Sequence, residues 1–256
     1  MKGLAEHRWS DAQLKDIQSL LERYNFIAEL KRPLDGERSA GILTADLMAR
    51  GKYRLNELTR DPSSAGSAAA NSFGAMMPHG WYDLEKLNYC RLFDLQLKGA
   101  FNAQAKRVFP AQIASNVKAL DRALAGRNPV TVILTRHQLL AAILLPALAK
   151  VPQKAALAQV VADEALIGCA LERYRLAHGQ FPETLDALAP EFIAKLPADV
   201  IGGAAYKYRR TQDGQFVLYS VGWNEIDDGG RNATNGNARD RLKTDWVWQY
   251  SAGAVH

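Results

Sequence analysis

Few residues of this 256-residue chain have the types and spacings that catalysis requires. Ser115 and Lys118 match the pattern S-x-x-K, which in some acyl-transfer enzymes places a lysine one helical turn from a serine nucleophile. The S-D-N and K-T-G motifs of those enzymes do not follow, so we interpret this pair as a solvated helix face. Glu164 and Glu172 fall two turns apart on one expected helix, about 12 Å along its axis. That separation exceeds the spacing of a catalytic carboxylate pair and indicates surface charge.

Metal ligation by histidine or cysteine is not indicated either. No two of these residues have the spacing of a zinc site. They are His7, His79, His137, His178, His256, Cys90 and Cys169. Both cysteines lie in apolar helical contexts, where a buried free thiol is expected. G-x-S-x-G, Walker A and dinucleotide-binding motifs are also missing from the sequence. The sequence therefore favours a protein that is not an enzyme.

The composition is that of an ordinary globular protein, with 48% hydrophobic and 23% charged residues. The net charge of +5 is spread along the chain instead of forming a basic run with interleaved aromatics. We therefore expect no nucleic-acid partner.

The start of the chain does not read as a signal peptide. The most apolar stretch is interrupted by Arg136 and His137, so we expect membrane attachment only through a segment absent from this chain.

Helices dominate the first part of the chain. Ser10 and Gln13 form an S-x-x-Q capping box that predicts a helix start. Apolar periodicity and the positions of proline and glycine predict helices over 10–31, 40–49, 81–108, 111–125 and 155–178. Pro33 is expected to end the first of these helices and Pro110 the third. Small and turn-forming residues predict a long loop over 61–80.

The character of the sequence changes after Gly179, which is expected to end the longest helix in a left-handed conformation. Thr184 is expected to cap a short helix at 185–188. Alternating residues predict two strands, 205–210 and 215–221, joined at Asp213-Gly214. The predicted fold class is α+β, with a long helix packed on a small antiparallel sheet. We expect a helical domain over 1–154 and an α+β module over 155–256.

The order of elements in this module resembles the globular part of type II secretion pseudopilins, above all the major pseudopilin. In that family the helix carries a pattern E-x-Y/F-x-x-x-x-G-x-Y/F-P. The positions of the pattern are occupied here by Glu172, Tyr174, Gly179, Phe181 and Pro182. The apolar segment 139–155 also resembles the N-terminal helix of pilin-like proteins, although it is internal and lacks the prepilin cleavage signal. The resemblance implies a pseudopilin-like module within an envelope protein.

The resemblance also implies a calcium site, because the loop before the last strand of the major pseudopilin holds a calcium ion. The implied ligands are the Val221 carbonyl and the side chains of Asn224, Asp227, Asp228 and Asp245. Asn224 stands where the family has an aspartate, which removes one charge from the site. The alternative is a polar turn in which these side chains bond to the backbone without a metal.

The function implied by the resemblance is that of a non-catalytic protein on the periplasmic side of the cell envelope. Its expected partners are other protein subunits of an envelope assembly. The expected contact surfaces are the apolar segment 139–148 and the aromatic tail, Trp246, Trp248 and Tyr250. The alternative for the tail is that its aromatic side chains pack back on the hairpin. The alternative is a hydrolase or ligand-binding protein. Its site would lie between the helical part and the C-terminal module, using the 79–81 loop and Asp83.

Overall fold

The computed structural model describes residues 4, 7–54, 57, 77–125, 135–231 and 243–248. Residues 61–76 of the predicted long loop, and Tyr250 of the aromatic tail, lie outside these ranges. The elements form an α+β fold with long helices and two small antiparallel sheets, which confirms the predicted fold class.

The chain folds as two compact units. One unit, here called the sheet unit, comprises 1–29, 101–110 and 152–256, and the other, the helical unit, comprises 30–100 and 111–151. This division differs from the expected domains, 1–154 and 155–256. The reason is that the first helix and a short hairpin near residue 105 pack with the C-terminal part of the chain.

The first helix of the sheet unit is α2 (Asp11–Leu21), and it begins with the predicted capping box of Ser10 and Gln13. The continuous helix expected over 10–31 is wrong, because a turn separates α2 from α3 (Phe26–Glu29). Gln159 stabilises this turn. Its side chain accepts a hydrogen bond from the Phe26 amide at 2.8 Å and donates one to the Tyr24 carbonyl at 3.4 Å.

Helix α11 (Val151–His178) is the longest element of the chain. It ends at Gly179 with φ +77°, the left-handed conformation that the sequence predicts. Phe181 follows, is only 2% exposed, and packs edge-on against Phe216 with ring centroids 4.9 Å apart.

The next element, η2 (Leu185–Leu188), is a 3₁₀ turn. Thr184 makes no side-chain cap to it, so that expectation is wrong.

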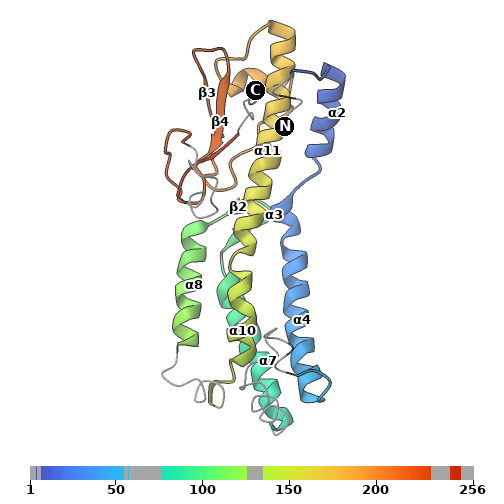
Figure 1. Cartoon of the computed structure of the whole chain (residues 1–256), viewed down its shortest axis with the longest axis vertical. Helices are drawn as coiled ribbons and strands as arrows, with labels where there is room; N and C mark the ends of the chain where they lie inside the picture. The colour runs from blue at the N-terminus through green and yellow to red at the C-terminus, as the bar shows by residue number, and fades with distance from the viewer. Residues whose placement is uncertain are drawn as a thin grey trace, which may run out of the picture. The chain divides into compact units, whose positions relative to one another are not determined.

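The sheet that faces α11 has three antiparallel strands in the order β3 (Lys207–Arg210), β4 (Phe216–Ser220) and β5 (Trp246–Val247). The hairpin of β3 and β4 confirms the two predicted strands (Figure 1). The aromatic tail supplies β5, in which Trp246 pairs with Ser220. A Cβ on Gly168 of α11 would lie 3.4 Å from the Trp248 ring, so helix and tail pack closely.

A second, smaller hairpin joins β1 (Phe101–Asn102) to β2 (Arg107–Val108). The predicted helix over 81–108 is therefore too long. Helix α7 (His79–Leu97) ends where Lys98 leaves helical geometry, and Gly99 follows with φ +63°.

The helical unit contains α4 (Lys31–Ala49), α7, α8 (Pro110–Leu124) and α10 (Leu139–Leu148). Helices α4, α7 and α10 pack on one another (Figure 1). Pro33 and Pro110 were expected to end helices and instead lie at helix starts, α4 and α8 respectively. Proline is tolerated there because the first helical amides have no partner within the helix.

The start of α10 is held by a buried carboxylate. Glu85 of α7 accepts hydrogen bonds from the Leu139 amide at 3.0 Å and the Leu140 amide at 3.1 Å. Burial raises the pKa of Glu85, and these two hydrogen bonds oppose that rise. The side chain thus caps a helix that has no capping residue of its own.

Among the described residues, one helical stretch, 139–178, reaches the length and mean hydropathy of a helix that could cross a membrane, although none is expected from the sequence. A core helix of a soluble protein passes the same test. Buried Asp163, Glu164 and Glu172 all fall within this stretch.

Candidate functional site

The C-terminal loop, residues 221–231, folds against residues 243–245. Gly222 makes this approach possible, since its φ is +69° and a Cβ there would lie 2.4 Å from the Thr244 carbonyl oxygen. Asp245 closes the loop. Its two carboxylate oxygens accept hydrogen bonds from the Asp228 amide at 3.2 Å and the Gly230 amide at 2.7 Å.

Three of the five expected calcium ligands meet at this closure. The Asn224 side-chain amide donates to the Asp228 carboxylate and to the Lys243 carbonyl, each at 3.0 Å. Burial raises the pKa of Asp245, and the charges of Asp228 and Asp227 raise it further, while its two backbone hydrogen bonds oppose the rise. The loop therefore gathers negative charge at one place.

The other two expected ligands have different partners. Asp227 accepts hydrogen bonds from the Tyr219 hydroxyl and the Gly229 amide, both at 3.0 Å, and lies 3.3 Å from Lys207. The Gly229 hydrogen bond is the main cause of the lowered pKa of Asp227. The Val221 amide donates to Asp199 at 3.2 Å.

The chemistry of this loop suits a hard cation, because all of the expected ligand atoms are oxygens. Within the described ranges, however, no group of three or more histidine, cysteine, aspartate or glutamate side chains is placed to hold a metal ion. Asp228 and Asp245 would be the anionic ligands, with Asn224 and backbone carbonyls completing the shell. The hydrogen bonds of Asp245 already close the loop without an ion.

The middle of α11 carries acids that the sequence led us to place on the surface, and this expectation is wrong. Glu164 is 3% exposed and Glu172 is 1% exposed. Arg175 at 2.7 Å and His7 at 2.9 Å pair with Glu172. Burial alone would raise the pKa of Glu172, but the hydrogen bonds from Arg175 and His7 outweigh burial and lower it.

Glu164 has a different environment. Burial raises its pKa well above the ordinary value, and the nearby charge of Asp199 adds to the rise. One of its oxygens, Oε1, has no hydrogen-bond partner among the described residues. Asp199 itself accepts from the Ile201 and Val221 amides, which ties the connector before β3 to the start of the C-terminal loop.

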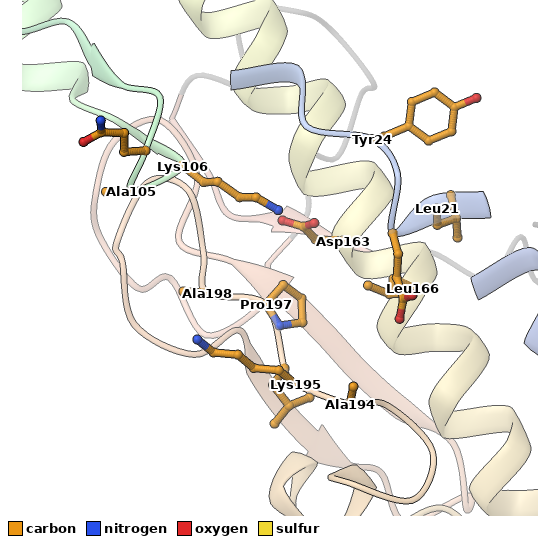
Figure 2. A pocket seen from close by; sticks show the side chains of 13 residues that line it. Leu21, Tyr24, Ala105, Lys106, Asp163, Leu166, Ala194, Lys195, Pro197 and Ala198 are labelled. Atoms are coloured by element: carbon orange, nitrogen blue, oxygen red, sulfur yellow. The ribbon is translucent and has the colours of Figure 1, made fainter. Parts of the chain in front are cut away.

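Asp163, the neighbouring acid, lines an open cavity of about 540 Å³ within the sheet unit (Figure 2). Four segments form the walls: the end of α2, the β1–β2 turn, α11 and the connector before β3. The lining residues are Leu21, Glu22, Tyr24, Gln104, Ala105, Lys106, Asp163, Leu166, Ala194, Lys195, Leu196, Pro197 and Ala198.

Buried polar contacts hold these walls in place. Asp163 accepts hydrogen bonds from the Gln159 side-chain amide at 2.9 Å and from the Tyr206 hydroxyl at 3.0 Å. Gln159 also binds the α2–α3 turn, as described above. The β1–β2 hairpin is tied to the connector by the Arg107 guanidinium, which donates to the Ile201 carbonyl at 2.9 Å. The cavity is therefore preorganised by interactions that do not involve a ligand.

Sequence reasoning missed this cavity. The available signal was the pair Asp163-Glu164 in the middle of an otherwise apolar helical stretch, ALAQVVADEALIGCALE. A helical stretch that is apolar on nearly every side leaves little solvent face for its acids, which indicates that at least one of them is buried. The alternative site expected near His79 and Asp83 is at the start of α7, where Asp83 pairs with Lys86 at 2.9 Å.

Comparison of the chain with known protein families, with curated proteins and with solved structures finds no match in any of the three.

Proposed function

We propose that this chain is a non-catalytic protein of the bacterial cell envelope, on its periplasmic side. It acts through contacts with other protein subunits of an assembly related to type II secretion, and calcium stabilises its C-terminal loop. The observation that carries the proposal is the helix stop at Gly179. The segment that follows turns back so that Phe181 and Pro182 both contact the sheet.

The geometry of this helix stop supports the proposal. Gly179 adopts the left-handed conformation. Phe181 is buried against Phe216. The Pro182 carbonyl accepts a hydrogen bond from the Tyr208 hydroxyl at 2.7 Å. A long helix is thereby joined to an antiparallel hairpin, which is the arrangement expected of a pseudopilin-like module.

The C-terminal loop offers a surface for a protein partner. Ile226 is 59% exposed, an unusual position for a large apolar side chain. Beside it along the loop, Trp223 stacks on Trp246 with ring centroids 6.4 Å apart. Trp223 is partly exposed, while Trp246 and Trp248 of the aromatic tail are buried, so Ile226 and Trp223 are the side chains that a partner could contact.

Calcium enters the proposal as a stabiliser of this loop, not as a catalyst. Asp228 and Asp245 would supply charge, and Asn224 and the Val221 carbonyl would supply neutral oxygens. When bound, the ion would neutralise the repulsion between the acids that the fold brings together. Asp227 is the least available of the expected ligands, since it already binds Tyr219 and Lys207.

Photocrosslinking in the native bacterium tests the assembly role. A photoreactive residue replaces Ile226, and a matched control replaces Asp213, which lies in the exposed β3–β4 turn of the same sheet. The proposal predicts a discrete adduct with another envelope protein from position 226 and none from position 213. Equal labelling from both positions, or adducts only with cytoplasmic proteins, would contradict it.

A further inference from the structure

We propose that the cavity beside Asp163 binds a small zwitterion with an apolar side chain, the size of a free amino acid or a dipeptide. This inference is independent of the assembly role, because neither the C-terminal loop nor the exposed Ile226 lines the cavity. Its volume of about 540 Å³ falls within the range of small-molecule sites, about 300 to 1,000 Å³.

Asp163 offers the cavity an acceptor for a ligand amine. Asp163 is only 7% exposed, and the two donors that it binds occupy part of the capacity of its carboxylate. A carboxylate has about four lone-pair sites, so further sites remain for an ammonium group entering from the cavity. Gln159 and Tyr206 fix the orientation of the carboxylate, which lowers the entropy lost when a ligand binds.

Two lysines offer partners for a ligand carboxylate. Lys106 and Lys195 come from different segments, and both are exposed. Figure 2 shows the Lys106 side chain extending toward Asp163, with Lys195 on the other side of Pro197. Lys106 has φ +50°, a conformation that residues other than glycine rarely adopt. The hairpin thus holds this lysine at the cavity despite an unfavourable backbone geometry.

The charges and apolar side chains that line the cavity favour a zwitterion over a simple ion. Glu22 and Asp163 balance the two lysines, so the formal charge of the cavity is close to zero, and Lys195 lies apart from Asp163 on the other side of Pro197. A plain anion or cation would meet a like charge in such a site. Apolar side chains fill the walls between the charges and would contact the side chain of the ligand. They are Leu21, Leu166, Leu196 and Pro197.

The test is a titration of the full chain with L-alanyl-L-leucine, followed by two-dimensional amide NMR. We expect shifts concentrated at Ala105, Lys195 and Ala198, with a dissociation constant of about 1 mM or lower. The N-acetylated dipeptide lacks the ammonium group and should bind about tenfold more weakly, the loss typical of a charge-assisted hydrogen bond. The dipeptide amide lacks the carboxylate and should bind about threefold more weakly, because the lysines are exposed.

Variants separate this site from a general charge effect. Lys195→Met and Lys106→Met should each weaken binding, while Lys154→Met, an exposed lysine of α11 outside the cavity, should not. Asp163→Asn should weaken binding strongly. Tyr206→Phe removes a hydrogen bond that orients the same carboxylate and should weaken binding less than Asp163→Asn does.

Three results would overturn the inference. One is the absence of localised shifts at about 20 mM dipeptide, a concentration well above the expected dissociation constant. Another is equal binding of the free, acetylated and amidated forms. The third is an equal effect of Lys154→Met and Lys195→Met.

Discussion

The hydroxyl of Tyr206, just before β3, donates a hydrogen bond of 3.0 Å to the carboxylate of Asp163 on α11. This contact joins the helix to the sheet at a buried point, and burial raises the pKa of Tyr206 well above its usual range. Tyr206→Phe keeps the ring and removes only the hydrogen bond. We expect the free energy of unfolding to fall by about 1 kcal/mol, measured by chemical denaturation.

The matched control for this variant is Tyr24→Phe, because Tyr24 is exposed and stacks on Phe26 through its ring. Loss of the Tyr24 hydroxyl should leave the free energy of unfolding within about 0.5 kcal/mol of the value for the unaltered protein. Equal effects at the two positions would show that the Tyr206 hydroxyl does not join helix and sheet.

Glu164 should make the protein less stable as pH rises. Burial and Asp199 raise its pKa in the folded state above the ordinary value of 4.5, so the folded chain holds a proton that the unfolded chain releases. Its contribution is therefore present at low pH and is lost as pH rises above about 4.5. Glu164→Gln removes this ionisation. The free energy of unfolding of the variant should match that of the original protein near pH 4 and exceed it near pH 8. Chemical denaturation at the two pH values measures the difference.

Other buried acids also titrate, so the informative quantity is the difference between variant and original. Glu191→Gln, at an exposed position, serves as the control and should leave the pH dependence unchanged. If Glu164→Gln follows the original protein at every pH, the carboxyl is not held neutral in the folded state.

Gly222 should tolerate no side chain, because it combines a left-handed conformation with close contact to the Thr244 carbonyl. Gly229 has a similar φ of +74° but nothing near its missing Cβ, so it isolates the conformational cost. We expect Gly229→Ala to cost about 1 kcal/mol and Gly222→Ala about 3 kcal/mol or more. Thermal unfolding compares them, and equal losses would mean that the loop does not approach residue 244 this closely.

Glu85 should be essential to the start of α10. Glu85→Ala leaves the Leu139 and Leu140 amides without their acceptor in a buried place, which should cost about 3 kcal/mol. Glu85→Gln keeps one acceptor oxygen and should cost less. Amide hydrogen exchange over 140–148 measures this loss locally, and unchanged protection in Glu85→Ala would rule out the cap.

Features set by neighbouring residues could be predicted from the sequence. The Ser10 capping box, the helix end at Gly179 and the β3–β4 hairpin around Asp213-Gly214 all form as expected. In each case the residues that determine the geometry lie within about four positions of one another.

Features set by distant contacts could not be predicted in the same way. The break after Leu21 depends on hydrogen bonds from Gln159, more than 130 residues later. The burial of Glu164 depends on the sheet that covers it. The cavity brings together Lys106, Asp163 and Lys195, which no local pattern connects. Proline disrupts the interior of a helix but is favoured in its first turn, and the sequence alone does not show which position it occupies. This explains the wrong predictions at Pro33 and Pro110.

The proposed kinship with secretion subunits implies that the loop closed by Asp245 binds calcium, and thermal unfolding in calcium and in chelator tests this most directly. A cation that binds only the folded state stabilises it by about 2.7 kcal/mol at a hundred times its dissociation constant. The account predicts a Tm several degrees higher in calcium than in chelator. That difference should be lost in Asp228→Asn and kept in Glu225→Gln, which alters an acid of the same loop outside the expected ligands. The same Tm in calcium and in chelator for the unaltered chain would contradict the calcium-stabilised loop.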